Sequence, residues 1–346
     1  MASLAISPLL MIIMAMAISI LKLRAAPDEG YDIGVNYGML GDNLPPAHEV
    51  VQLFKQYGIT KMRLFDPNHD ALEALRGSKL LLSLGVRNED IPSIGSSPDA
   101  AYQWYAAHIQ PYQNDILWAY ITVGNKINLF SQDPISTNLV PAMKNLRTVL
   151  NNNGLPNLFV TTVLAAEVLG VSNPPSAGDF APAVKPIMLD ILTFLSTTNA
   201  PLMVNLYPYL AYAGDPVHIS LDYALFNASE PPVVDGALKY YNLLDAMTDA
   251  FTYAIERQGI MNVGLTVAES GWPSAGNGQI TTPELAQMYN RNFVNHILSR
   301  LGTPKRPGAY VDAFIFAIFN ENQKPPGVEQ NWGLYYPNMN RVYPLF

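Results

Sequence analysis

The sequence LWAYITVGN, residues 117–125, is an apolar run that ends on polar residues. It is followed by the helical pattern PAMKNLRTVLNNNG (141–154) and then by a second apolar run, LFVTTVL (158–164). The helical pattern ends on Gly154, which suits a left-handed helix C-cap. Two nearly continuous apolar strands joined by a helix are typical of a parallel sheet whose outer face is covered by helices.

The same alternation extends in both directions along the chain. Eight strand and helix units in roughly 310 residues suit a closed barrel better than an open sheet, so we predict an α/β fold, a (β/α)8 TIM barrel formed as a single domain by residues 27–346. A doubly wound sheet is the alternative, but NYGMLGDNLP after the first strand does not match GxGxxG. The other predicted strands are 32–38, 61–67, 79–86, 202–208, 263–270 and 312–321, and further helical patterns are 46–58, 241–259 and 283–302.

The composition limits the possible partners. The chain has 346 residues, of which 49% are hydrophobic, and a formal net charge of -8, which argues against nucleic acid as a partner. It has no cysteine, so a disulfide framework is excluded. The five histidines show no ligand spacing such as HxxxH, so we expect neither a transition-metal site nor a cofactor.

The N-terminal residues 1–26, MASLAISPLLMIIMAMAISILKLRAA, contain a long apolar run followed by small residues. This pattern predicts a cleaved secretory signal peptide and a secreted protein, extracellular or in the cell wall, with the vacuole as a weaker alternative. Because Lys22 and Arg24 follow the apolar run rather than precede it, an uncleaved membrane anchor is the alternative. After cleavage we expect no membrane attachment and a monomer.

In a TIM barrel the chemistry lies at the C-terminal ends of the strands. Glu269 ends the seventh predicted strand, with Trp272 close behind it. A carboxylate at a strand end beside an aromatic ring suits the nucleophile of a retaining glycosidase, with the indole available to stack on a sugar. A glutamate that caps the following helix is the alternative, and position alone does not decide between them.

The segment around Glu269, VAESGWPSAG (267–276), resembles the signature of glycoside hydrolase family 17, the plant endo-β-1,3-glucanases. The resemblance implies a secreted or vacuolar (β/α)8 enzyme that cleaves β-1,3-glucan with retention and binds laminari-oligosaccharides. It covers nearly all of the chain after the signal peptide, through IGVNYGMLGDNLP, MRLFDPN, VLGVSNPPSAGDF, PLMVNLYPYLAYAGDP and FNENQKPPGVEQNWGLYYPN.

The resemblance also implies roles for individual residues. Glu269 falls on the family nucleophile, Glu321 and Lys324 fall on its supporting active-site pair, and Asn125 falls on the residue that hydrogen-bonds the sugar 2-hydroxyl. The acid/base of the family is the glutamate of a VGNE sequence on the fourth strand. This chain reads VGNK, so Lys126 stands where the proton donor is expected.

Lysine is a poor replacement for the missing carboxyl group. Its ammonium binds the proton too tightly to release it and cannot act as a base afterwards, so the roughly 10²- to 10⁴-fold contribution of acid–base catalysis is expected to be largely lost. Glu321 and Glu167 are alternative proton donors. The sequence therefore leaves open a weakened glucanase, a non-catalytic glucan-binding wall or defence protein and, remotely, a Schiff-base lysine.

Aromatic residues at the predicted barrel mouth complete the candidate site. They either stack on glucose rings or only form the wall of the mouth. These residues are Tyr37, Tyr207, Tyr209, Trp272 and Trp332.

Overall fold

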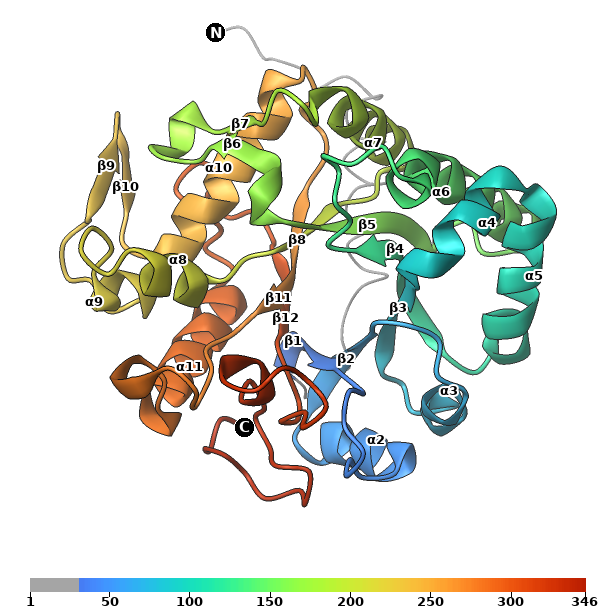
Figure 1. Cartoon of the computed structure of the whole chain (residues 1–346), viewed down its shortest axis with the longest axis horizontal. Coiled ribbons are helices and arrows are strands. Elements are labelled where there is room, and N and C mark those ends of the chain that lie inside the picture. The colour runs from blue at the N-terminus through green and yellow to red at the C-terminus, as the bar shows by residue number, and fades with distance from the viewer. Residues whose placement is uncertain (1–30) are drawn as a thin grey trace, which may run out of the picture.

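The computed structural model describes residues 31–346, and the predicted signal peptide lies outside them. In this part of the chain eight parallel strands close into a barrel in the order β1-β12-β11-β8-β5-β4-β3-β2 (Figure 1). The ring closes because β1 pairs with β2 on one side and β12 on the other. The predicted TIM barrel is therefore confirmed. Its strands are β1 (Tyr31–Tyr37), β2 (Ile59–Leu64), β3 (Leu81–Val86), β4 (Leu117–Asn125), β5 (Phe159–Ala165), β8 (Leu202–Asn205), β11 (Leu265–Ser270) and β12 (Asp312–Ile315).

Helices surround the barrel, and two small hairpins lie outside it (Figure 1). Neither hairpin is predicted from the sequence, since their strands have only two or three residues. The hairpins are β6 (Leu169–Val171) with β7 (Asp179–Phe180), and β9 (Val233–Asp235) with β10 (Leu238–Tyr240). The helices are α2 (Ala47–Gln56), α3 (His69–Leu75), α4 (Ile91–Ser96), α5 (Pro98–His108), α6 (Pro134–Asn152), α7 (Lys185–Thr198), α8 (Pro208–Gly214), α9 (Leu221–Ala224), α10 (Leu243–Arg257) and α11 (Pro283–Ser299).

Helix ends follow local capping chemistry. The left-handed conformation predicted for Gly154 after α6 is confirmed by its φ of 81°, and Gly58 and Gly259, which follow α2 and α10, likewise have φ of 64° and 78°. The predicted start of α6 at Pro141 is wrong. The helix begins at Pro134, because the side chain of Asp133 accepts a hydrogen bond from Ser136 N at 2.9 Å and caps it, and Pro141 lies inside the helix.

Two apolar layers hold the barrel together. The larger packs the outward-facing side chains of the strands against the helices. The smaller joins side chains of five strands, Tyr120, Val163, Met203, Ala268 and Phe314, and each of them has at least one immediate neighbour along its strand in the larger layer. Side chains alternate along a strand, so this second cluster fills the barrel interior.

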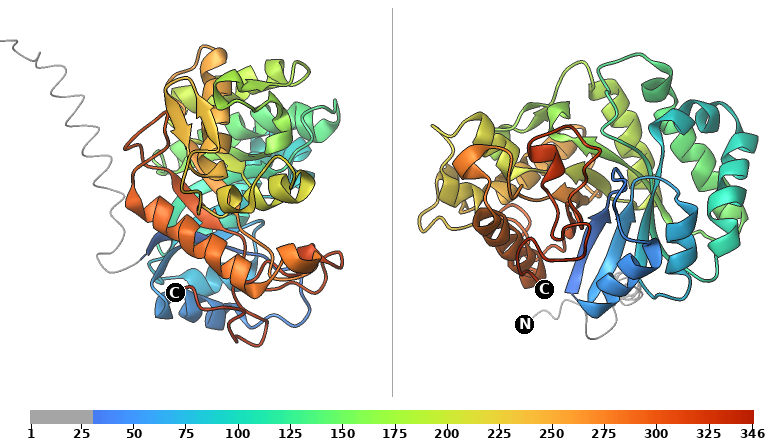
Figure 2. Two further views of the ribbon diagram at one scale, coloured as in Figure 1. Left: turned by 90° about the vertical axis from the view of Figure 1, so that its left-hand side faces the viewer. Right: turned by 60° about the horizontal axis from the view of Figure 1, so that its bottom comes forward.

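The chain after β12 crosses the mouth of the barrel beside β1 (Figure 2). The predicted strand 312–321 ends early, at Ile315, because residues after it bond to the segment 332–335 instead of only to the flanking strands. Ala317 N donates to Trp332 O and Asn320 N donates to Tyr335 O, both at 3.0 Å. Glu321 therefore lies on a loop and not on the eighth strand. Between residues 31 and 346, none of the helices is both long and apolar enough to cross a bilayer.

Candidate active site

Glu269 is the buried centre of the site, with only 1% of its side chain exposed at the end of β11. Arg63 Nη1 donates to its Oε1 at 3.0 Å, and the hydroxyl of Tyr207 donates to its Oε2 at 2.8 Å. Burial raises the pKa of Glu269, but the charges of Arg63 and Lys126 and these hydrogen bonds outweigh burial and lower it. Glu269 is thus an ionised carboxylate in a fixed orientation.

Arg63 connects Glu269 to an amide cluster, a role that the sequence pattern alone does not predict. It is fully buried in β2, where Nη1 also donates to Asn36 Oδ1 at 2.9 Å and Nη2 donates to Asn125 Oδ1 at 3.3 Å. Asn205 Nδ2 reaches the same oxygen of Asn125 at 3.2 Å. An arginine between the apolar residues Met62 and Leu64 of a predicted strand is the available signal, since a buried arginine needs carboxylate or amide partners.

Lys126 follows Asn125 at the tip of β4 in a left-handed conformation, with φ of 53°. Asn88 fixes this tip by donating to Asn125 O at 3.0 Å and accepting from Asn125 N at 2.9 Å. The Lys126 ammonium lies 3.8 Å from Glu269 Oε2 and 5.8 Å from the ring centre of Tyr207. Its side chain is 52% exposed, so the ammonium faces both the buried carboxylate and the solvent.

Glu321 and Lys324 form the pair expected from the resemblance. Lys324 Nζ lies 2.7 Å from Glu321 Oε2, and Leu40 N donates to Oε1 at 2.8 Å. Gly38 allows this arrangement, because a Cβ there would lie 2.5 Å from the Glu321 oxygens. Both oxygens of Glu321 are thus engaged by the protein. Glu167, the other alternative donor, is exposed in a short turn after β5.

The aromatic residues at the mouth pack mainly on one another. Tyr207 contacts Trp332 edge to face at 5.1 Å, and Tyr209 contacts Trp332 at 5.5 Å. Tyr37 is 4% exposed, packs edge to face on Phe319, and has its pKa raised to about 12, mainly by burial. Burial and the neighbouring Glu269 also raise the pKa of Tyr207, so its phenol keeps the proton that it donates. These side chains form the wall of the mouth, and their stacking on a sugar stays a prediction.

The prediction that Trp272 stacks on a sugar is wrong. Its side chain is fully buried, and its indole nitrogen donates to Ile280 O at 2.8 Å. Tyr209 and Tyr289 contact the indole ring at 5.1 and 5.6 Å. The chain turns after Glu269, so nearness in sequence does not place the indole on the same surface as the carboxylate.

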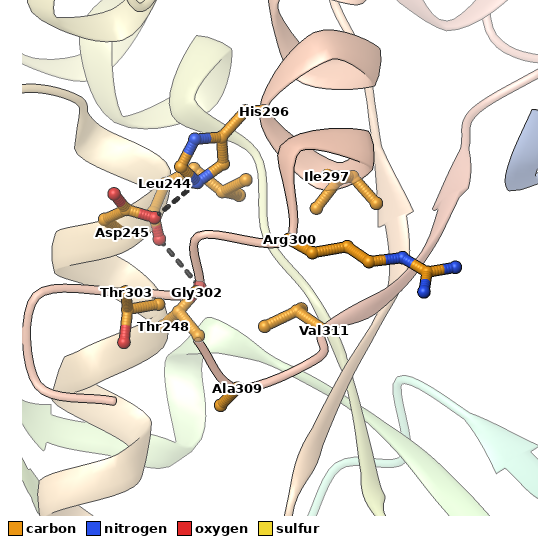
Figure 3. A pocket seen from close by; sticks show the side chains of 10 residues that line it. All are labelled: Leu244, Asp245, Thr248, His296, Ile297, Arg300, Gly302, Thr303, Ala309 and Val311. Atoms are coloured by element: carbon orange, nitrogen blue, oxygen red, sulfur yellow. Dashed lines mark hydrogen bonds and ion pairs between the residues drawn. The ribbon is translucent and has the colours of Figure 1, made fainter. Parts of the chain in front are cut away.

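A small cavity elsewhere in the protein does not compete with this site. It has a volume of about 20 Å³ and lies between α10, α11 and the segment before β12. Figure 3 shows His296 pointing at Asp245 beside it, and His296 Nε2 lies 2.8 Å from Asp245 Oδ1. This space holds about one water molecule and is too small for a sugar.

Comparison with known proteins identifies the family. Residues 33–345 match the family described as glycosyl hydrolases family 17. The chain belongs to this family. It is 48% identical to a probable glucan endo-1,3-beta-glucosidase of Arabidopsis thaliana over 90% of this chain and 88% of the relative. It is also 46% identical to Lichenase-2 of Hordeum vulgare, over 92% and 99% of the two chains.

A solved structure agrees with this assignment. A beta-1,3-glucanase and allergen of Cryptomeria japonica pollen has 47% sequence identity and a TM-score of 0.87, over 90% of this chain and 98% of that chain. The predicted family and the barrel fold are both confirmed by these comparisons. The consequence of Lys126 for the chemistry is a separate question, because it depends on what an ammonium can do beside Glu269.

Proposed function

We propose that this protein binds β-1,3-glucan in the manner of an endo-β-1,3-glucanase and that Lys126 greatly slows hydrolysis. The observation that carries the proposal is the 3.8 Å separation between the Lys126 ammonium and Glu269 Oε2. A retaining glycosidase holds its second carboxyl about 5–5.5 Å from the nucleophile. In this chain the side chain beside the nucleophile is a cation.

Each half of the retaining reaction then lacks one proton transfer. In the first half Glu269 would attack the anomeric carbon, while a general acid protonates the departing sugar oxygen. In the second half a general base would remove a proton from the attacking water. The Lys126 ammonium performs neither transfer well at neutral pH, and the carboxylate of Glu321 is held by Leu40 and Lys324.

Sugar binding does not require that lost proton transfer. The amide of Asn125 is oriented by Arg63 and Asn205, as expected for a group that hydrogen-bonds a sugar hydroxyl. We expect laminari-oligosaccharides to bind with a Kd between roughly 1 μM and 1 mM, the usual range of enzyme substrates. Titration calorimetry without saturable heat up to tens of millimolar would contradict the proposal.

The test of the chemistry is the substitution Lys126→Glu. It supplies a carboxyl group opposite Glu269, so laminarin hydrolysis should rise by about 10²-fold or more. Lys126→Ala removes the ammonium without supplying an acid and should leave hydrolysis low. The measurement is reducing-sugar release at mildly acidic pH. Wild-type protein as fast as Lys126→Glu would contradict the proposal and would make Glu321 and Glu167 the next residues to test.

A non-catalytic glucan-binding protein is the second candidate. It is favoured by the engagement of both oxygens of Glu321, one of the two alternative proton donors, by Leu40 and Lys324. A Lys126→Glu protein that is folded and binds glucan, yet stays inert, would favour this candidate. We also propose that the protein is secreted as a monomer after removal of residues 1–26. N-terminal sequencing and light scattering of the secreted protein test these two points.

A further inference from the structure

The immediate surroundings of Glu269 carry an excess of positive charge. Arg63 and Lys126 both face this single carboxylate, at 3.0 and 3.8 Å. Lys324 is balanced by Glu321 at 2.7 Å. Glu269 itself is thus faced by two cations, although the whole chain has a formal net charge of -8. If Glu269 formed an ester with a sugar, it would lose its charge and leave both cations unbalanced.

The two cations differ in their access to solvent. The Arg63 side chain is 0% exposed and already bonded to Glu269, Asn36 and Asn125. The Lys126 side chain is 52% exposed, and 3.8 Å separates its ammonium from the carboxylate. A small anion that pairs with the ammonium at about 2.8 Å can therefore lie next to a sugar carbon held by Glu269. Reacting atoms need an approach of about 3–3.5 Å.

We propose that this site transfers β-glucosyl groups from donors whose leaving group departs as a stable anion to anionic acceptors, and that Lys126 binds both anions. The donor class is phenolic or acyl β-glucosides, and the acceptor class is carboxylates. The proposal rests on the proposed function, because the same cleft must hold the sugar.

The steps balance without a proton donor or a base. An oxygen of Glu269 attacks the anomeric carbon, and the bond to the leaving group breaks, with its electron pair leaving on the phenolate or carboxylate. The acceptor carboxylate oxygen then attacks the same carbon from the other face. The ester bond to Glu269 breaks, the carboxylate of Glu269 is restored, and the product keeps the β configuration. No atom is oxidised or reduced.

Water is the slow competitor in the second step. A water molecule must lose a proton as it attacks, and Lys126 cannot accept one while it is charged. A carboxylate or azide ion arrives without a proton to lose, and the ammonium raises its local concentration. The residue that disables hydrolysis would therefore favour transfer to an anion.

The experiment uses the mature protein with 2,4-dinitrophenyl β-laminaribioside as donor. Without added anion we expect one equivalent of dinitrophenolate in a burst, slow turnover afterwards, and a laminaribiosyl group on Glu269 in peptide maps. Sodium formate or azide should raise the steady rate at least about 10-fold and saturate, since a general base is worth roughly 10²- to 10⁴-fold. Azide should give the β-laminaribiosyl azide.

Two variants connect the effect to the ammonium. Lys126→Met keeps an unbranched side chain without charge, and we expect it to raise the half-saturating anion concentration at least about 10-fold. Lys144→Met, at an exposed position of α6, should leave the anion response unchanged. Equal anion responses of wild type and Lys126→Met would overturn the role of Lys126.

Other results separate this proposal from the previous one. If laminari-oligosaccharides bind in calorimetry but no burst or label appears, glycosyl transfer is refuted and glucan binding stands. A burst without acceleration by either anion also refutes transfer. If neither binding nor a burst is seen, the proposed function is refuted, and glycosyl transfer is refuted with it.

Discussion

Each end of the barrel buries a cation from β2 against carboxylates, Lys61 in a lower cluster with Asp32 and Asp312, and Arg63 in an upper cluster with Glu269. The two clusters differ in their balance of charge. At the N-terminal end, Lys61 Nζ lies 2.5 Å from Asp32 and 2.6 Å from Asp312, and it donates to the Tyr310 hydroxyl at 2.8 Å. At the C-terminal end, Arg63 lies 3.0 Å from Glu269, and Lys126 stands 3.8 Å away from the same carboxylate.

The difference lies in how completely each cluster is satisfied. The lower cluster is closed, since Arg300 pairs with Asp32 at 3.0 Å and the Tyr120 hydroxyl donates to Asp312 at 2.9 Å. Two cations there face two carboxylates. In the upper cluster two cations face the single carboxylate of Glu269. The outer cation is partly exposed in both clusters, Arg300 at 65% and Lys126 at 52%, so the difference is in the number of carboxylates. A closed cluster serves stability, whereas the open one can take a ligand.

The largest expected effect comes from breaking the lower cluster with Lys61→Met. This removes the cation between Asp32 and Asp312, so buried Asp312 loses its charge partner and Asp32 keeps only Arg300. Loss of one partner from a buried ion pair costs about 3–5 kcal/mol in the free energy of unfolding. Urea unfolding followed by tryptophan fluorescence measures it. A loss below about 1 kcal/mol would mean that the cluster does not stabilise the fold.

Lowering the pH should reduce the free energy of unfolding through both clusters, by an amount between the effects of Lys61→Met and Lys126→Met. Burial raises the pKa of Asp32, but Lys61 and other partners outweigh it and lower that pKa. Burial likewise raises the pKa of Glu269, but Arg63 and other partners outweigh it and lower that pKa. A carboxyl group whose pKa is lower in the folded state stabilises the fold at pH values above its pKa in the unfolded chain, about 3.9 for Asp and about 4.3 for Glu. This stabilisation is lost as the pH falls through the pKa of the folded state. Each unit of difference is worth about 1.4 kcal/mol.

The matching measurement is the free energy of unfolding between pH 7 and pH 3. We expect no loss from these two groups down to about pH 5 and a decline below about pH 4. Asp32→Asn and Glu269→Gln should each remove part of that decline. Lys61, whose pKa is raised by its two carboxylates despite burial, stays charged over this range and adds no slope. An unchanged acid slope in both variants would contradict this assignment.

The sequence predicts the strands more fully than the side-chain contacts at their ends. Eight apolar runs suffice for the barrel, because burial on both faces produces such runs. The role of Arg63 is not visible in the sequence, because it depends on hydrogen bonds to Glu269 and Asn125, which lie on strands far away in the chain. Trp272 was misassigned because the turn after β11 directs its ring toward Tyr289 on α11. Contacts between strands far apart in sequence are not visible in local patterns.

The smallest expected effect comes from Lys126→Met, the same change of residue type that we predict to be so costly at position 61. The Lys126 ammonium is half exposed, so water already solvates it, and Glu269 keeps Arg63 and Tyr207 when it is gone. Exposed ion pairs contribute about 0–1 kcal/mol, so the free energy of unfolding should fall by no more than that. The same urea experiment measures it, and salt should shrink the difference further. A loss of about 3 kcal/mol or more would place Lys126 in the class of buried ion pairs. Its ammonium would then be a part of the fold, and it would not be free to meet an anion.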